Sequence, residues 1–407
     1  MPTKLFHRDF TLVVIGQLIS LFGNTILRFA LSLYVLDVTA SATVFGTVTA
    51  LAVIPTILLS PLGGLLADRV NRRNIMVVLD FLTALLVWGF AGLLAPGNAV
   101  AATALLLVAL SIIQACYTPA VQSSIPLLQR EENFTRANAV VNQVTMLAGL
   151  VGPVLGGLLY GVLGARPLLN ISAACFFASA LLELFIRIPH TPRDREAGLL
   201  ASVRADLSDS ARFLTREQPV VLRTILFVAA FSLFAVPVVT VGMPYLLRTR
   251  LGMDSALYGL AEGLMALAGV GGALLCALRG DRLRAGAGPL LLSALAVAPM
   301  GAAFLLPLPV PARYGVLVLS TMLLQVCFTV FSIVTLSAIQ RRTPPALLGK
   351  VTACILSLTM CAQPAGQFLF GVLLDRVSVP VLLAGAAALS ALLAGLARGT
   401  LTRLGEG

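Results

Sequence analysis

Charged residues are scarce in this chain. Asp, Glu, Lys and Arg make up only 11% of the 407 residues, whereas 58% of the residues are hydrophobic. A soluble domain carries roughly 25% charged residues, because polar groups must cover its surface. The scarcity of charge therefore excludes an ordinary water-soluble domain and indicates a chain whose main solvent is lipid.

Metal clusters, paired cysteines and nucleotide-binding loops are also missing from the sequence. The chain has two histidines and six cysteines, and no two cysteines are spaced as Cys-x-x-Cys. The cysteines lie in apolar runs, where we interpret them as small packing residues, so we expect no metal. Gly349-Lys350 lacks the glycine loop of a P-loop, which argues against ATP as the energy source. We expect no cofactor and no enzyme activity, because no set of nucleophile, base and orienting group stands out.

Twelve long apolar runs dominate the sequence. A membrane-spanning helix needs about 20 mostly apolar residues, and the length of the chain suits twelve of them with short loops. The predicted spans are residues 10–36, 44–67, 75–95, 100–122, 139–163, 168–188, 221–247, 256–278, 288–306, 314–340, 348–374 and 379–396. The first run is too long for a cleaved signal peptide. The expected fold is an all-α membrane protein with twelve transmembrane helices.

The positions of the basic residues predict the orientation. The net charge is +11, but the basic residues form no stripe with interleaved aromatics, so no nucleic-acid partner is expected. If both termini are cytoplasmic, most basic residues lie in inside loops, as the positive-inside rule requires. The basic residues left outside or within the membrane are Arg28, Arg166, Arg248, Arg250, Arg313 and Arg376. We therefore expect a multi-pass protein of the cytoplasmic membrane with both termini in the cytoplasm.

One polar stretch divides the twelve runs into two sets of six. Within it, Leu207, Ala211 and Leu214 recur at helical spacing with charged residues between them. This pattern predicts a short amphipathic helix on the inner membrane surface. The expected domains are an N-terminal six-helix bundle (1–188), a cytoplasmic linker (189–220) and a C-terminal six-helix bundle (221–407).

The two halves also repeat each other. Asp68-Arg69 follows the second run, and Asp281-Arg282 follows the eighth, which is the second run of the other half. Two six-helix halves related by duplication are typical of secondary transporters. The repeat predicts two pseudo-symmetric bundles.

The loop after the second run carries a motif. Its sequence, GGLLADRVNRR, resembles the pattern Gly-x-Leu-Ala-Asp-Arg-x-Gly-Arg-Arg/Lys of the major facilitator superfamily. Asn71 stands where the family has glycine, and Asn tolerates the left-handed backbone that such a turn can need. The resemblance implies a twelve-helix transporter whose inner side is latched in the outward-open state. The implied latch residues are Gly64, Asp68, Arg69, Arg72 and Arg73.

Physical reasons support this latch. Gly64 would let two helices approach closely, and Asp68 would pair with Arg72 and cap a neighbouring helix N-terminus. The alternative is a basic loop that only fixes the topology.

The fifth run carries a second motif. Gly152, Pro153, Gly156 and Gly157 resemble the Gly-Pro-x-x-Gly-Gly core of the family's antiporter motif, although its upstream glycines are absent. The resemblance implies export rather than uptake. The alternative is an ordinary packing face of small residues in a kinked helix.

The chain as a whole resembles one branch of the superfamily. Residues 17–45 and 123–140 are similar to the macrolide-efflux and enterobactin-exporter-like permeases. This resemblance covers nearly the whole chain but does not fix a substrate.

Polar residues within the spans indicate a binding cavity, because polar groups in a bilayer are costly and are usually kept for function. The family resemblance places the first, fourth, seventh and tenth helices around the substrate. The candidate cavity residues are Gln17, Asn24, Arg28, Gln114, Tyr117, Gln325 and Phe328. Amides, aromatic rings and one cation suit an amphipathic solute that is anionic or rich in oxygen. The alternative roles are hydrogen bonds between helices and, for Arg28, contact with lipid headgroups.

Two carboxyl groups are candidates for proton coupling. Glu262 lies in the eighth run and Asp80 in the third, and a carboxylate in apolar surroundings can carry a proton near neutral pH. Glu262 alternatively pairs with Arg28 or faces water, and Asp80 alternatively pairs with the basic loop at Arg72 and Arg73. Glu183 and Arg187 are four residues apart and are interpreted as a simple ion pair.

The spans and the repeat predict a secondary active transporter that works by alternating access. The family resemblance implies that it exports a small amphipathic compound (a drug, macrolide-like or siderophore-like) against protons. Its expected partners are the small-molecule substrate, protons and membrane lipid, and a monomer is expected. One alternative is an uptake permease for a small metabolite. A second is a membrane protein that moves lipid, or acts as a sensor, without proton coupling.

Overall fold

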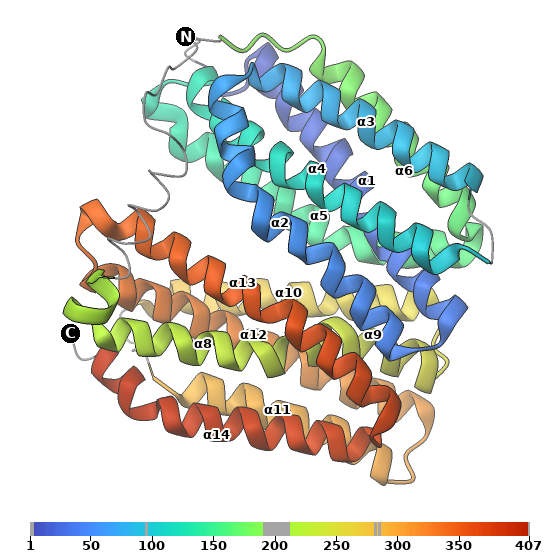
Figure 1. The fold of residues 1–407 in the computed structure, drawn as a ribbon, viewed down its shortest axis with the longest axis vertical. Coiled ribbons are helices and arrows are strands. Elements are labelled where there is room, and N and C mark those ends of the chain that lie inside the picture. Colours follow the sequence, from blue (N-terminus) through green and yellow to red (C-terminus); the bar gives the residue numbers. More distant parts are fainter. Residues whose placement is uncertain (1–3, 94–96, 190–211, 281–282, 284–285, 406–407) are drawn as a thin grey trace. The chain divides into compact units, whose positions relative to one another are not determined.

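The structure is a computed structural model that describes residues 4–93, 97–189, 212–280, 283 and 286–405. Within these residues the regular elements are helical, and twelve helices are long and apolar enough to cross a membrane (Figure 1). This confirms the predicted all-α fold with twelve spans. The predicted amphipathic helix of the linker falls largely on residues 190–211, outside the described part of the chain.

The helices begin and end near the limits of the apolar runs. Helix α9 belongs to a seventh span, Pro219–Arg250, that also contains α8 and two π-helical segments. The bounds are α1 Arg8–Thr39, α2 Ala42–Arg69, α3 Arg72–Leu93, α4 Ala99–Leu128, α5 Phe134–Leu163, α6 Ala165–Glu183, α8 Pro219–Pro237, α9 Met243–Tyr245, α10 Ser255–Arg279, α11 Gly288–Leu305, α12 Val310–Arg342, α13 Pro345–Arg376 and α14 Val379–Gly405.

The chain divides into two compact units. Unit 1 contains Met1–Ala40, Leu51–Asp194 and Met253–Gly263. Unit 2 contains Ser41–Ala50, Arg195–Gly252 and Leu264–Gly407. Two short segments thus cluster differently from the predicted halves: the start of α2 belongs to unit 2, and the start of α10 belongs to unit 1.

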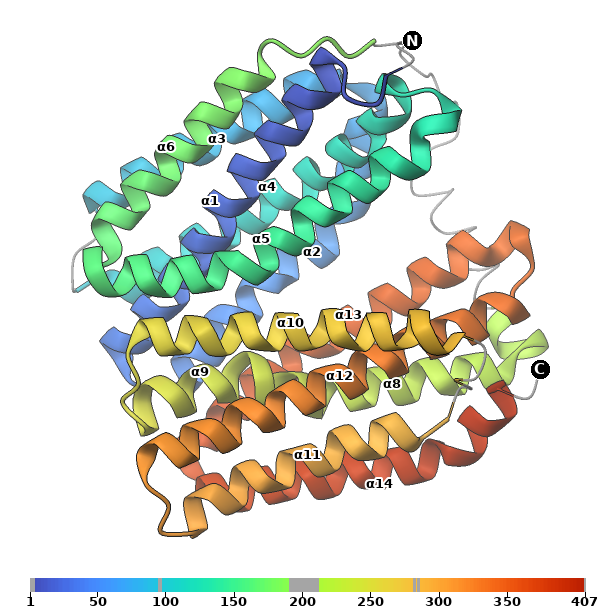
Figure 2. The same cartoon turned by 180° about the vertical axis from the view of Figure 1, so that it is seen from behind.

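Helix α1 is central to unit 1. It packs against α4, α5 and α6, and α3 packs against α4 and α6 (Figure 2). Leu27 and Leu31 are almost completely buried on α1. The helix stops at Ala40, whose left-handed φ of 47° is incompatible with a continuing α-helix. Because α1 touches three other helices, a polar side chain on it can reach several partners.

Glycines let α5 approach its neighbours closely. A Cβ atom on Gly152 would lie 2.6 Å from Thr25 of α1, and one on Gly156 would lie 3.1 Å from Phe29. On the next face of α5, a Cβ on Gly157 would overlap the main-chain carbonyl of Ser255 at the start of α10. These contacts show tight helix packing at this motif, which fits both the antiporter motif and the alternative of an ordinary small-residue packing face.

The glycine that brings α2 close to α4 is Gly63 and not Gly64. A Cβ on Gly63 would overlap the main-chain carbonyl of Ala115, whereas a Cβ on Gly64 meets no atom within 4 Å. The predicted close approach at Gly64 is therefore wrong. The two residues are adjacent, so they lie about 100° apart around the helix, and only one of them faces α4.

In unit 2, α8 packs against α13 and α14, while α11 packs against α12 and α14.

The first turn of α2 is capped by a carboxylate from α13. Asp375 accepts hydrogen bonds from the Ser41 hydroxyl (2.7 Å), the Thr43 backbone N–H (2.8 Å) and the Ala42 backbone N–H (3.0 Å). A negative charge at a helix N-terminus satisfies N–H groups that have no partner within the helix. No pattern in the sequence indicates this cap, because its partners are more than 300 residues apart.

The contrast between Gly63 and Gly64 can be tested by adding one methyl group at each position. Gly63→Ala should destabilise the protein by roughly 1–3 kcal/mol, because α2 or α4 must shift to admit the Cβ atom. Gly64→Ala should be neutral or stabilising by up to about 1 kcal/mol, because Ala is the better helix former. Thermal unfolding of the purified protein, followed by size-exclusion chromatography, measures both. Equal loss of stability in the two variants would contradict the packing described here.

Candidate functional site

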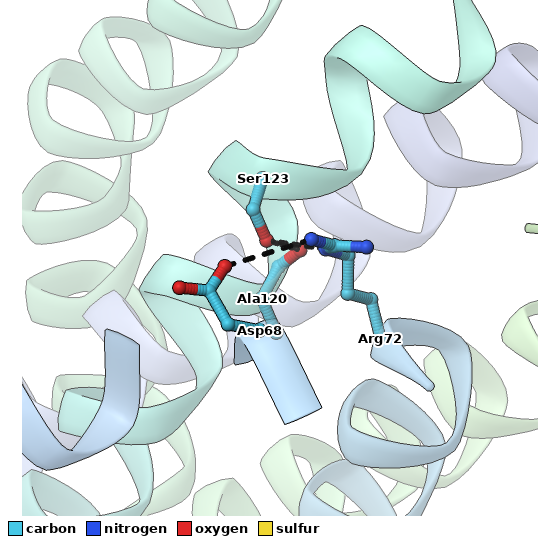
Figure 3. Close-up of polar contacts among 4 residues, drawn as sticks. All are labelled: Asp68, Arg72, Ala120 and Ser123. Carbon is cyan, nitrogen blue, oxygen red and sulfur yellow. Dashed lines mark hydrogen bonds and ion pairs between the residues drawn. The ribbon is translucent and has the colours of Figure 1, made fainter. Parts of the chain in front are cut away.

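The Asp68 loop is short and ordered by polar contacts (Figure 3). Arg72 lies 3.8 Å from Asp68, as predicted, and its Nε donates a hydrogen bond to the Ser123 hydroxyl at 2.8 Å. The Ser123 hydroxyl in turn donates to the Ala120 carbonyl at 3.3 Å. Arg72 therefore connects the end of α2 to α4, while Arg69 is exposed at the last position of α2.

Asn71 caps helix α3. Its side-chain oxygen accepts a hydrogen bond from the backbone N–H of Arg73 at 3.0 Å, and α3 begins at Arg72. Among described non-glycine residues only Ala40 has a positive φ, so Asn71 is not in the left-handed conformation that the family glycine suggested. The helix cap expected from Asp68 is thus provided by Asn71. The Arg73 guanidinium donates to the Leu184 carbonyl at the end of α6.

Arg28 is held between α1 and α4 by neutral side chains. Its Nε donates to the Asn24 side-chain oxygen at 3.1 Å, and both terminal nitrogens donate to the Ser111 hydroxyl at 3.3 Å. Asn24 donates to the Gln114 side-chain oxygen at 3.3 Å, and Gln114 donates to the Thr118 hydroxyl at 2.7 Å. Three of the predicted cavity residues, Asn24, Arg28 and Gln114, thus belong with Ser111 and Thr118 to one hydrogen-bonded group, which we call the Arg28 cluster.

The charge of Arg28 has no carboxylate partner among the described residues. The side chain bonds to α1 and α4 and does not depend on lipid headgroups for its hydrogen bonds. A guanidinium has five N–H donors, so hydroxyl and amide oxygens leave donor capacity for an added anion. The Arg28 cluster can therefore bind a carboxylate, a phosphate or an oxygen-rich group.

Gln17 and Tyr117 are buried in a second polar group in unit 1. Gln17 donates to the Tyr117 hydroxyl at 2.6 Å, and this hydroxyl donates to Glu183 Oε1 at 2.8 Å. Asp80 lies in the same region and accepts a hydrogen bond from the Ser20 hydroxyl at 3.2 Å. These side chains join α1, α3, α4 and α6, and each is at most 5% exposed.

Two sequence interpretations fail at this second group. Asp80 does not pair with Arg72 or Arg73, because both arginines lie at the start of α3 and bind other atoms. Glu183 does not form the expected ion pair with Arg187: α6 ends at Glu183, so the helical i,i+4 geometry is not available. The backbone N–H of Arg187 instead donates to Asp9 at 3.1 Å.

Glu262 belongs to the part of α10 that clusters with unit 1. Its Oε1 accepts a hydrogen bond from the Tyr258 hydroxyl at 3.0 Å, and the Tyr258 ring stacks on Phe29 of α1 with centroids 4.9 Å apart. Glu262 forms no ion pair with Arg28 or another described residue. The predicted coupling residue is thus a carboxyl group with a single hydroxyl donor from its own helix.

Gln325 and Phe328 lie in unit 2 on α12. The Gln325 amide donates weakly to the Thr329 hydroxyl at 3.5 Å, and the Phe328 ring stacks on Phe231 with centroids 6.4 Å apart. Phe328 also lines a cavity of about 200 Å³ within this unit. Two hydroxyls in its wall, those of Thr335 and Thr359, have no hydrogen-bond partner in the described part of the chain.

Fold and site together define a multi-pass membrane transporter built from helices. A family model for the Major Facilitator Superfamily matches residues 13–358, and the chain belongs to this family. The resemblance that the Asp68 loop indicated is therefore confirmed, and the family consists of transporters and not of enzymes.

Named relatives match most of the chain. The chain is 24% identical to macrolide efflux protein A of Streptococcus pyogenes over 381 residues, with 89% of each chain covered. It is 27% identical to the multidrug efflux pump Tap of Mycolicibacterium fortuitum over 395 residues, with 93% and 94% covered. Among solved structures, the nucleoside transporter NupG has a TM-score of 0.75 at 15% identity, covering 97% and 98% of the chains, which supports the fold alone.

The Asp68–Arg72 pair can be tested with Asp68→Asn, Arg72→Gln and the double variant. Asp68 is 55% exposed, so removing the pair should change the free energy of unfolding by less than about 1 kcal/mol. If the loop acts as a latch, each single change should lower transport several-fold, and the double change should be no worse than the poorer single variant. Transport losses that multiply in the double variant would show that the two residues act independently.

Proposed function

We propose that this protein is a proton-coupled exporter of a small amphipathic compound that carries an anionic or oxygen-rich group. It would work by alternating access in the cytoplasmic membrane, with both termini in the cytoplasm. The observation that carries the proposal is Arg28, a membrane-embedded cation whose described partners are all neutral.

Energetics favour a ligand for this arginine. An arginine in the middle of a spanning helix costs roughly 2.5–3.5 kcal/mol on insertion scales, and structures usually offset that cost with a counter-charge. Asn24 and Ser111 orient the guanidinium but do not neutralise it. A substrate anion would supply the missing charge, and the amide of Gln114 would add a donor or an acceptor beside it.

The apolar part of the substrate needs a different surface. In unit 2, the stacked rings of Phe231 and Phe328 and the cavity beside Phe328 offer apolar walls with a few hydroxyl groups. Binding sites for drug-sized molecules have this composition, mostly apolar with few polar anchors. We propose that Phe328 and Gln325 contact substrate in unit 2.

Export is favoured by two observations. The relatives named above are a macrolide efflux protein and a multidrug efflux pump. The glycine face around Pro153, which resembles the antiporter motif, packs against both α1 and the start of α10. For proton coupling we propose Glu262 and Asp80, which are carboxyl groups within spans and have hydroxyl partners only.

Arg28 can be tested by measuring export from cells that express the protein, using a panel of anionic, neutral and cationic compounds. Arg28→Ala should lose export of the anionic or oxygen-rich compounds by at least tenfold, because a charge-assisted hydrogen bond contributes about 1.5–3 kcal/mol. Arg28→Lys should retain part of the activity, since it keeps the charge but not the planar fork. The matched control is Arg136→Gln on the exposed surface of α5. Unchanged export in Arg28→Ala would overturn the site.

Glu262 can be tested in proteoliposomes with an imposed pH gradient. Glu262→Gln should abolish export driven by protons but preserve counterflow, in which substrate exchanges without a gradient, because the amide keeps the shape and loses the titrating group. The control is Glu217→Gln, because Glu217 is exposed and lies between α6 and α8 in the sequence. Proton-driven export that survives in Glu262→Gln would remove this residue from the coupling mechanism. Uptake instead of export by the wild type would replace the exporter by a permease.

A further inference from the structure

Two buried carboxyl groups of unit 1 lie next to the Arg28 cluster along α1 and α4 but share no hydrogen bond with it. Glu183 of α6 is 0% exposed and Asp80 of α3 is 2% exposed. Glu183 lies beside Gly16 of α1 and is linked to Gln17 through Tyr117, while Asp80 bonds to Ser20 one turn further along α1, so both carboxyl groups lie against the same stretch of this helix. The two carboxyls are therefore a pair, although they are about 100 residues apart in the sequence.

Each carboxyl group has one satisfied and one unsatisfied oxygen. Glu183 Oε1 accepts from Tyr117, and Asp80 Oδ1 accepts from Ser20. Glu183 Oε2 and Asp80 Oδ2 are buried and have no hydrogen-bond partner among the described residues. A buried acceptor on an ionised group without a donor is strongly unfavourable. A proton on one of the two carboxyl groups would supply the hydrogen-bond donor that these oxygens lack.

The charged groups around the pair do not supply this donor. Helix α1 contributes only the neutral side chains of Gln17 and Ser20, and α4 contributes Tyr117. Arg73, which contacts the carbonyl of Leu184 next to Glu183, forms no ion pair with either carboxyl in the described part of the chain. Two carboxylates in such surroundings cannot both be ionised at low cost.

We propose that Asp80 and Glu183 form a proton-binding pair that holds one proton, and that Tyr117 and Gln17 connect this pair to the substrate-binding helices. Protonation converts one carboxylate to a carboxylic acid, and its O–H becomes the donor that the unpartnered oxygens lack. No other bond is made or broken.

The connection to substrate follows from positions on α1 and α4. Gln17 precedes Asn24 by two helical turns on α1, and Tyr117 follows Gln114 by one turn on α4. A movement of α4 along α1 on substrate binding would strain the bonds from Gln17 to Tyr117 and from Tyr117 to Glu183. If Glu183 lost the hydrogen bond from the Tyr117 hydroxyl, it would need a second proton to be stabilised in its buried position. Glu183 thereby joins Asp80 as a coupling residue, an inference that rests on the proposed proton coupling but does not need Glu262.

The proton itself can be observed by infrared difference spectroscopy on the full-length protein in nanodiscs, following the carbonyl band of protonated carboxyl groups during a pH titration. The wild type should show a protonated carboxyl at neutral pH, and the double variant Asp80→Asn/Glu183→Gln should lose its band. Each single variant should shift or remove it, because the proton belongs to the pair. Glu217→Gln is the exposed control, and Glu262→Gln should leave this band in place. A band that is unchanged in both single variants would overturn the pair.

Tyr117→Phe separates a proton-binding role from a structural one. It keeps the ring and removes only the hydroxyl, so the midpoint of the carboxyl titration should move by about one pH unit, since a hydrogen bond to a charged group is worth that much. If Asp80→Asn fails to accumulate as folded protein, Tyr117→Phe and Glu183→Gln decide the question. An unmoved midpoint in both would contradict the proposal.

Transport measurements keep the failure of this inference distinct from failure of the proposed function. In proteoliposomes, Glu183→Gln should retain counterflow of a transported compound but shift the pH dependence of proton-driven export. If the wild type exports without a proton gradient, the proposed coupling fails, whereas the infrared result still decides whether the pair binds a proton. If export is proton-driven and Glu183→Gln has the wild-type pH profile, the pair has no part in coupling and this inference alone fails.

Discussion

Lipid offers no hydrogen-bond partners, and this constraint shapes the interior of unit 1. Every polar side chain on the spanning helices must find its partner on another helix or on its own backbone. Asn24 with Gln114, Gln17 with Tyr117 and Ser20 with Asp80 meet this requirement across α1, α3 and α4. Two charged groups of the candidate site meet it only in part. Among the described residues, the Arg28 guanidinium has no counter-charge, and two oxygens of the Asp80–Glu183 pair have no hydrogen-bond donor.

These incomplete groups lie on a common scaffold. Helix α1 carries Gln17, Ser20, Asn24 and Arg28 at spacings of three and four, so they lie along one face of the helix. Glycines on α5 bring that helix close to Thr25 and Phe29 on another part of α1. Because α1 is packed this tightly, the ligand proposed at Arg28 and the proton proposed at Asp80 would act on the same helix. Substrate and proton can then bias the same movement, which is the requirement for coupled transport.

The sequence was sufficient wherever the signal is local, and insufficient wherever it depends on tertiary pairing. Hydropathy located the twelve spans, and the i,i+4 spacing of Asn24 and Arg28 became a hydrogen bond. No pattern shows that Tyr117 reaches Glu183, 66 residues away. The Glu183–Arg187 interpretation is wrong because an i,i+4 ion pair needs a helix that continues to Arg187, whereas α6 ends at Glu183. Gly63 and Gly64 were confused because α2 is apolar on all sides, so the sequence does not show which face packs against α4.

In the mechanism that we propose, Arg28 binds an anionic or oxygen-rich group of the substrate. The most direct measurement is an experimental structure of the protein with an exported compound bound. We predict that an oxygen of the compound lies within hydrogen-bond distance of the Arg28 guanidinium and replaces Ser111 or Asn24 as its partner. A compound bound elsewhere, with Arg28 still held by Asn24 and Ser111 alone, would contradict the account.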